Sequence, residues 1–320
     1  MLHARIRSSV FLLATACAAL AGFASRARAR RGPQAGIAPA HWVAVAHALG
    51  VPGEIRGDVF RVDFSPALPR VRMGRVFLAP GALDPSWVTF GEQAALGWMV
   101  GRVTLTSAQA PAAIGQLAQA GIEVTGAVDP LPGASPSITT IYFREVGEAA
   151  PLARSLKQAL GPALRAPASP RRFGVGRLDV AAIERVLDRR GQPVSGALVF
   201  RVARPEQVKC CGVPSDPLLV FSGLPLGPAT GVESRFAFQS LSAGALVFGR
   251  LAVRHGEINP VERAFSVFGI RTVALAEPLV DEQPRISFLY FFGRGKALEL
   301  AGGLRAAIER IHHLPPVTPP

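Results

Sequence analysis

The sequence predicts an α+β protein made of two tandem homologous repeats related by a pseudo-twofold axis. Each repeat is expected to be a mostly antiparallel sheet packed with about two to three helices. Three observations lead to this fold class. The chain has 320 residues, enough for one large or two medium cores. Segments with period-two apolar alternation are interleaved with segments of helical spacing. Residues 87–160 also align without a gap on residues 235–308.

Matching residues fall at the same places in the two copies. Tyr142 and Tyr290 are the only tyrosines of the protein, and they differ in position by 290 − 142 = 148. The same offset superimposes Gly101-Arg102 on Gly249-Arg250. Because so rare a residue would seldom coincide by chance, we interpret the repeat as an internal duplication. The two tyrosines are therefore expected in equivalent strands.

The first repeat is expected to span residues 42–162. Alternating apolar and polar residues predict strands, because successive side chains of a strand point to opposite faces. These strands are expected at residues 57–64, 70–78, 86–90, 96–105, 122–128 and 137–143. Helical spacing closed by a glycine predicts helices at residues 39–50, 106–121 and 147–161.

After a Pro/Gly/Arg-rich linker at residues 163–178, the same order of elements begins again. The second repeat is expected to span residues 179–311. Its predicted helices lie at residues 178–191, 256–269 and 296–311, and its strands at 196–202, 234–239, 243–253, 270–276 and 285–292. Residues 312–320 form a Pro-rich tail that is expected to be extended.

Residues 1–29 have the pattern of an export signal. Arg5 and Arg7 precede the apolar run of residues 10–24, and a small-residue cleavage site follows at 27–29. The apolar run is short for a membrane span. We therefore expect an exported periplasmic or extracellular protein without a stable membrane span, and with at most a peripheral association with the envelope.

The mature chain is expected to begin with a lead-in at residues 30–41. An alternative interpretation makes Cys17 a lipidated first residue, since the run LATAC resembles a lipobox. Ala14 stands where such a motif usually has Leu or Val, and soluble export is the interpretation that we prefer. Removal of the signal leaves Cys210 and Cys211, which lack the CxxC spacing of redox and zinc sites.

The formal net charge of +13 raises the question of a nucleic-acid partner. Residues 1–31 contain six arginines and no acidic residue, so a product that starts near Gly32 carries 13 − 6 = +7. The sequence pairs this charge with neither a basic helix nor an aromatic RNA-binding motif. We expect no nucleic-acid partner.

Several runs of the sequence resemble the LppY/LpqO family of exported bacterial proteins and lipoproteins, whose biochemical role is not established. The resemblance covers roughly residues 42–162 and 179–311. Its carriers include PSWVTF and the run from Val100 to Leu131 in the first half, and EINPV and EQPRISFLYFF in the second.

The resemblance implies a metal site that this chain lacks the residues to build. Family members typically carry His-Asn-His where this chain has Val128-Asp129-Pro130 and Ala276-Glu277-Pro278, and often a further His where Tyr142 and Tyr290 stand. Two histidines at i and i+2 of an extended segment share a face, and a third from a neighbouring strand would complete a plausible site. We expect no metal and no other cofactor.

The family's usual Asp after the glycine of GRVTL is replaced by Arg102 here, and by Arg250 in the second half. Each half thus combines an arginine, an acid and a tyrosine. The candidate binding residues are Arg102, Asp129, Tyr142, Arg250, Glu277 and Tyr290. We interpret the charged ones as surface salt bridges. The alternative is a remodelled pocket for an unknown small or anionic ligand. The tyrosines are expected to be buried rings with a backbone partner.

Two classes of function follow. The preferred one is a non-catalytic exported binding protein, in which the sheets of the two repeats face a shared cleft and the family's metal site is lost. The other is a metal-independent, hydrolase-like enzyme that uses Asp129 or Glu277 as acid or base, with Tyr142 or Tyr290 as proton donor. The sequence contains neither a GxSxG nor an HExxH motif, and it assigns no catalytic residue.

Overall fold

The computed structural model describes residues 39–65, 68–93, 96–166, 174–210, 224–280 and 282–312. These residues belong to one compact unit that runs from Ala38 to Pro320. The expected export signal, Cys17, Cys211 and residues 313–320 of the tail lie outside the described residues.

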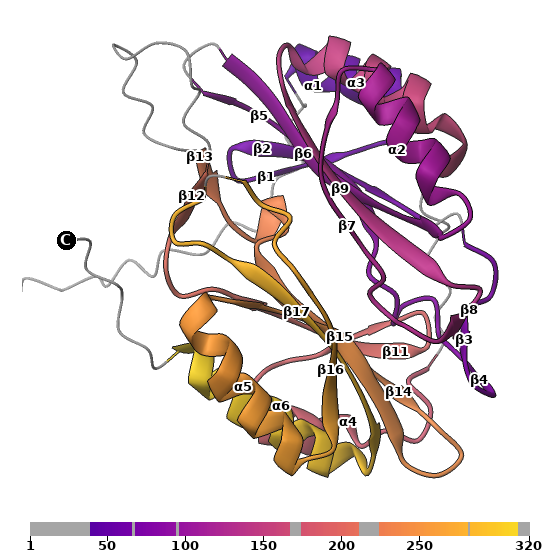
Figure 1. Ribbon diagram of the computed structural model, residues 1–320, viewed down its shortest axis with the longest axis vertical. Helices are drawn as coiled ribbons and strands as arrows, with labels where there is room; N and C mark the ends of the chain where they lie inside the picture. The colour runs from indigo at the N-terminus through magenta and orange to yellow at the C-terminus, as the bar shows by residue number, and fades with distance from the viewer. Residues whose placement is uncertain are drawn as a thin grey trace, which may run out of the picture. The chain divides into compact units, whose positions relative to one another are not determined.

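The first repeat contains a six-stranded antiparallel sheet in the order β1-β2-β5-β6-β9-β7. Its strands are β1 (Glu54–Arg56), β2 (Val59–Phe64), β5 (Ser86–Gln93), β6 (Leu96–Thr106), β7 (Glu123–Val128) and β9 (Ile138–Val146). Helices α1 (Ala40–Leu49), α2 (Ala110–Gln119) and α3 (Ala149–Leu160) cover one face of this sheet (Figure 1). A short 3-10 helix, η1 (Gly161–Ala163), follows α3.

The second repeat contains the same sheet in the order β10-β11-β14-β15-β17-β16. Its strands are β10 (Gln192–Val194), β11 (Ala197–Ala203), β14 (Glu233–Ser240), β15 (Ala245–Val253), β16 (Ile270–Ala276) and β17 (Ser287–Gly295). Helices α4 (Val180–Leu187), α5 (His255–Val267) and α6 (Ala297–His312) cover one face (Figure 1). Between β11 and β14 the chain adds β12 (Val208–Cys210), β13 (Leu224–Leu226) and the 3-10 helix η2 (Pro228–Thr230).

The α+β class and the tandem repeats are confirmed. Strands β9 and β17 are equivalent, and they pair with their neighbours in the same register. Tyr142 lies opposite Arg102 in the first sheet, and Tyr290 lies opposite Arg250 in the second. Even the register shift at the edge of each sheet recurs, after Val124 in one copy and after Thr272 in the other.

Each sheet and its helices enclose a core of side chains at helical and alternating spacing. In α3 the buried residues Leu152, Ala153, Leu156 and Leu160 form one stripe, as an amphipathic helix on a sheet requires. On the strands, every second residue joins this core, for example Val103 and Leu105 of β6.

The helix-free faces of the two sheets meet each other, as expected for two repeats whose sheets face one another, and buried side chains fill the space between them. Two further buried clusters combine apolar residues of both repeats, with Ile138 and Phe248 in one and Tyr142 and Tyr290 in the other. The polar positions of the alternating strands are therefore covered as well. Arg61 of β2 is only 2% exposed, although the alternation of its strand is typical of a half-buried strand.

The strand expected at residues 70–78 is instead a small hairpin. Its strands are β3 (Arg72–Met73) and β4 (Val76–Phe77), and β3 also pairs with β8 (Ala134–Ser135). The loop after this hairpin leads to Asp84 and approaches the second repeat closely. A Cβ atom added to Gly81 would lie 1.7 Å from the carbonyl oxygen of Val194, so only glycine fits there.

Glycine is also required where the central strands carry the site. A Cβ atom added to Gly249 of β15 would lie 2.3 Å from the carbonyl oxygen of Arg235 on β14. We predict that Gly249→Ala lowers the free energy of unfolding by about 2 kcal/mol or more, because the strand pair must separate. Gly115→Ala is the matched control, since an added Cβ there meets nothing within 4 Å. Because Gly115 lies inside helix α2, the control is expected to gain up to about 1 kcal/mol. Urea unfolding measures both, and equal effects would contradict the prediction.

Candidate functional site

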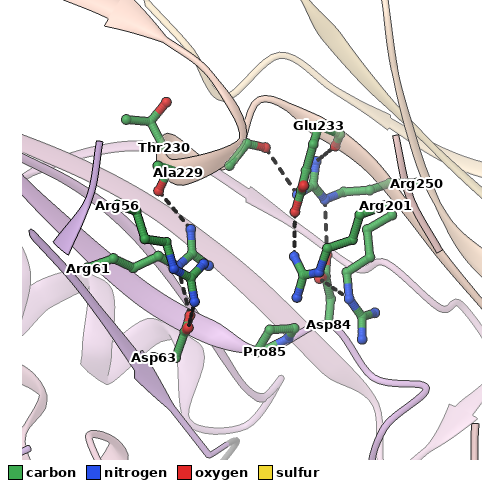
Figure 2. Close-up of polar contacts among 12 residues, drawn as sticks. Arg56, Arg61, Asp63, Asp84, Pro85, Arg201, Ala229, Thr230, Glu233 and Arg250 are labelled. Atoms are coloured by element: carbon green, nitrogen blue, oxygen red, sulfur yellow. Dashed lines mark hydrogen bonds and ion pairs between the residues drawn. The ribbon is translucent and has the colours of Figure 1, made fainter. Parts of the chain in front are cut away.

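The candidate site is a buried cluster of three arginines around Asp84, at the junction of the repeats. Arg250 of β15 donates from Nε to Asp84 Oδ2 at 3.0 Å (Figure 2). Arg102 of β6 forms an ion pair with Oδ1 of the same carboxylate. Arg235 of β14 places its Nε 3.4 Å from Oδ1. One carboxylate of the first repeat therefore contacts one arginine of its own sheet and two of the other.

Backbone carbonyls complete the coordination of the guanidinium groups. Arg250 donates to the carbonyl oxygens of Glu233 at 2.7 Å and Gly231 at 3.1 Å. Arg235 donates to those of Gly81 at 2.9 Å and Ala82 at 3.3 Å. The arginines thus fix both segments that enter the junction, one from each repeat. Fixed, multiply bonded geometry of this kind suits guanidinium better than ammonium.

The charges of the cluster do not balance. Three guanidinium groups face one carboxylate, so the local sum is 3 − 1 = +2. The arginine side chains are at most 4% exposed, whereas that of Asp84 is 22% exposed. Uncompensated buried charge is costly. The excess positive charge favours any anion that can reach the cluster.

The pKa directions follow from this imbalance. Burial by itself raises the pKa of Asp84, but the charges of Arg102, Arg250 and Arg235 outweigh it and hold that pKa far below its usual value. For Arg102, burial lowers the pKa, and the carboxylate of Asp84 overcomes this and raises it. Arg235 gains less from Asp84, and burial lowers its pKa to about 10. Arg235 is therefore the least compensated cation of the cluster.

A small cavity of about 30 Å³ lies beside the least compensated arginine. Asp84, Arg235 and Tyr290 line it together with Thr104 and Thr140, whose hydroxyl groups are 2.9 Å apart. The Nε of Arg235 is buried and makes no hydrogen bond within the described part of the chain. A guanidinium N–H that has an ion pair but no hydrogen bond, hydroxyl groups and excess positive charge thus lie around one cavity, an arrangement that suits an anion.

Tyr142 and Tyr290 come together across the junction through a hydrogen bond between their hydroxyl groups. The partner of each phenol is thus the other phenol and not a backbone group, which corrects the expectation from the sequence. Burial raises the pKa of Tyr290 well above its ordinary value, and Tyr142 raises it further, although Arg250 and Arg102 act in the opposite direction. The two equivalent tyrosines therefore meet where the two repeats face each other.

The two other acids predicted from the sequence are placed differently. Asp129 accepts a hydrogen bond from the backbone amide of Leu131 at 2.9 Å, as in an Asx turn. Glu277 is exposed and accepts one from the hydroxyl group of Ser287 at 2.9 Å. Among the described contacts neither carboxylate reaches a tyrosine hydroxyl group. The structure therefore brings together four of the six candidates, namely Arg102, Arg250, Tyr142 and Tyr290.

The interpretation of the arginines as surface salt bridges is wrong. Arg102 and Arg250 are each 2% exposed, and their acidic partner is Asp84, which sequence analysis missed together with Arg235 and the threonine pair. A signal was available for part of this set. Arg235 and Phe236 are consecutive residues of a predicted strand, so their side chains point to opposite faces of the sheet. The neighbouring strand of the same repeat carries Arg250.

A fourth buried arginine, Arg61, links the two repeats at a place outside the cavity. It donates to Asp63 at 2.9 Å and to the carbonyl oxygen of Ala229 at 2.8 Å, and both contacts are drawn in Figure 2. Its guanidinium lies 4.4 Å from the ring centroid of Trp87. Burial lowers the pKa of Arg61 to about 10, although Asp63 acts against this. Arg61 is thus about as buried as Arg235, but it does not line the cavity.

Only one of the two possible copies of the cavity is polar. At the offset of 148 that relates the tyrosines, Thr104 corresponds to Ala252 and Thr140 to Phe288. Asp84 likewise corresponds to Val232. These second-repeat residues join an apolar cluster that Val208 of β12 and Leu226 of β13 also enter. The duplicated fold thus carries one polar site and one apolar counterpart.

The residues present do not fit the metal site that the family resemblance implies. The positions of the expected imidazoles hold Val128, Pro130, Ala276 and Pro278, and the two phenols bond to each other. Within the described residues, no group of three or more His, Cys, Asp or Glu side chains is arranged to hold a metal ion. The absence of bound metal stays a prediction.

The match to a family model defines the class of protein. The family model described as Domain of Unknown Function (DUF1259) matches residues 43–161 and 181–310. The chain therefore belongs to this family, and carries its domain twice. No curated protein and no solved structure matches the chain. In the portion that the structure describes, none of the helices combines the length and apolar character needed to cross a membrane.

The tyrosine pair gives a pH prediction. Because the pKa of Tyr290 is raised in the folded state, its contribution to stability is present below the ordinary phenol pKa of about 10 and is lost as the pH rises toward the folded value. At about one pH unit above that ordinary value, native protein should show fewer phenolate equivalents by ultraviolet absorbance than unfolded protein. Tyr290→Phe should shrink this difference by one phenolate equivalent. Full ionisation of Tyr290 in the native state at that pH would contradict the assignment.

Proposed function

We propose that this protein is an exported, non-catalytic binding protein of the LppY/LpqO type, and that it binds a small anion at the arginine cluster between its repeats. This proposal rests mainly on the three buried guanidinium groups that surround a single carboxylate beside a cavity. The proposed organisation is a signal at residues 1–29, a lead-in at 30–41, repeats at 42–162 and 179–311, a linker at 163–178 and a tail at 312–320.

The size of the cavity limits the ligand. A cavity of about 30 Å³ exceeds the roughly 10 to 15 Å³ that one water-sized occupant requires. A monatomic anion such as chloride or bromide fits this volume, whereas a phosphate or an organic acid needs the loop around Asp84 to move. The Nε of Arg235, one hydroxyl group of the hydrogen-bonded Thr104–Thr140 pair and the hydroxyl group of Tyr290 supply donors to such an ion.

The arrangement supports binding over catalysis. A general acid or base must lie within hydrogen-bond reach of the group that it serves. Asp129 and Glu277 are engaged in local hydrogen bonds with Leu131 and Ser287. Asp84 is held ionised by three arginines, so it is a weak base. The hydrolase-like alternative has no such observation in its favour.

Thermal unfolding of the chain from residue 30 onward tests the proposal. Sodium chloride replaces sodium gluconate at constant ionic strength. A ligand that binds only the native state stabilises it by RT ln(1 + [L]/Kd), so chloride at tenfold its Kd should raise Tm by about 2 to 3 °C. Arg235→Gln and Thr140→Val should abolish most of this rise. The valine variant keeps the shape of the side chain and removes one hydroxyl donor.

Arg61→Gln is the matched control, because Arg61 is as buried as Arg235 but lies outside the cavity. It should lower Tm in both salts and preserve the difference between them. A wild-type Tm that does not depend on the halide would contradict the proposal. An equal loss of the halide effect in the Arg61 and Arg235 variants would contradict it as well.

A further inference from the structure

A second cavity, which we call the loop groove, lies between the segments that flank the β3–β4 hairpin and the second repeat. Its volume is about 420 Å³, within the range of about 300 to 1,000 Å³ typical of small-molecule sites. Residues 68–71 and 77–80 of the first repeat line it together with Leu83, the turn Ser195-Gly196 and Gln239. The larger cavity is therefore distinct from the arginine cluster, with Leu83 common to both.

Hydrogen bonds from the second repeat hold the groove in shape. The side-chain oxygen of Gln239 accepts from the backbone amide of Ala79 at 2.7 Å, and its Nε2 donates to the carbonyl oxygen of Phe77 at 2.8 Å. The amide of Gly81 donates to the carbonyl oxygen of Ser195 at 3.3 Å. A preformed cavity costs a ligand little ordering of the protein.

The lining of the groove is mostly apolar and carries one charge. Leu68, Leu78 and Leu83 belong to the cluster of apolar residues between the sheets, so they form an apolar floor of the groove. Arg70 is the only charged side chain among the described lining residues. Its guanidinium lies 4.1 Å from the ring centroid of Phe77, which is 47% exposed. A cationic side chain and an exposed aromatic ring therefore lie side by side in the lining of a mostly apolar cavity.

From this combination we infer that the loop groove binds an organic anion with an apolar body, such as an aromatic sulfonate or a medium-chain carboxylate. The acid group pairs with Arg70, and the apolar part displaces water from the floor and from the ring of Phe77. A purely inorganic anion gains nothing from the floor, and an organic cation is repelled by Arg70. The inference stands independently of the halide site.

The probe for this site is 1-anilinonaphthalene-8-sulfonate, and its neutral analogue N-phenyl-1-naphthylamine removes the charge. The wild-type protein should bind the sulfonate at one saturable site, and decanoate should displace it more effectively than decanol. Arg70→Gln should weaken the sulfonate roughly three- to tenfold and leave the neutral analogue unchanged. Phe77→Ala should weaken both probes.

Arg72→Gln is the matched control, since Arg72 is an exposed arginine of the same hairpin that does not line the groove. Equal weakening by the Arg70 and Arg72 variants would overturn the assignment, as would several weak sites or binding that Phe77→Ala leaves intact. Thr140→Val separates the two cavities, because it should remove the halide effect and keep sulfonate binding. Loss of halide binding alone therefore leaves the loop groove standing, and loss of sulfonate binding alone leaves the halide site standing.

Discussion

The structure depends on one carboxylate, that of Asp84, which holds together arginines from two separate sheets. Without it, Arg102, Arg235 and Arg250 would be cations buried against each other, and like charges at such distances repel strongly where the dielectric constant is low. With it, the arginines also bind the carbonyl oxygens of both entering loops. Because three guanidinium groups face only this one carboxylate, the cluster needs the carboxylate and still keeps an excess of positive charge that can attract an anionic ligand.

The duplication explains why this junction exists and why only one side of it is polar. Two copies of one sheet meet by their helix-free faces, so equivalent residues such as Tyr142 and Tyr290 approach each other. A strictly symmetric pair would bury two identical polar sites. Here Ala252 and Phe288 replace the threonines in one copy, and an apolar cluster fills that side. The protein thus concentrates its buried polarity, which is costly, in one place.

The sequence predicted the parts of the structure that depend on local pattern and repetition. Period-two and helical spacing located most strands and helices, and the shared offset located the paired tyrosines and arginines. The sheets were expected to face each other, but the burial of the arginines between them was missed, because an alternating strand such as β2 has the same pattern whether its polar face meets water or another sheet. Asp84 was missed for a related reason, since it lies in a loop and two of its three arginine partners, Arg235 and Arg250, are more than 100 residues away.

A double-mutant cycle between Asp84→Ala and Arg250→Met, followed by urea unfolding at neutral pH, tests the central claim most directly. Each single change should cost about 3 kcal/mol or more, because it leaves buried charge without its partner. The two should not add, and their coupling should exceed about 1.5 kcal/mol, because the second change removes what the first left uncompensated. Additive effects within about 0.5 kcal/mol would show that the carboxylate and the arginine act independently, and that the repeats are joined by something other than this ion pair.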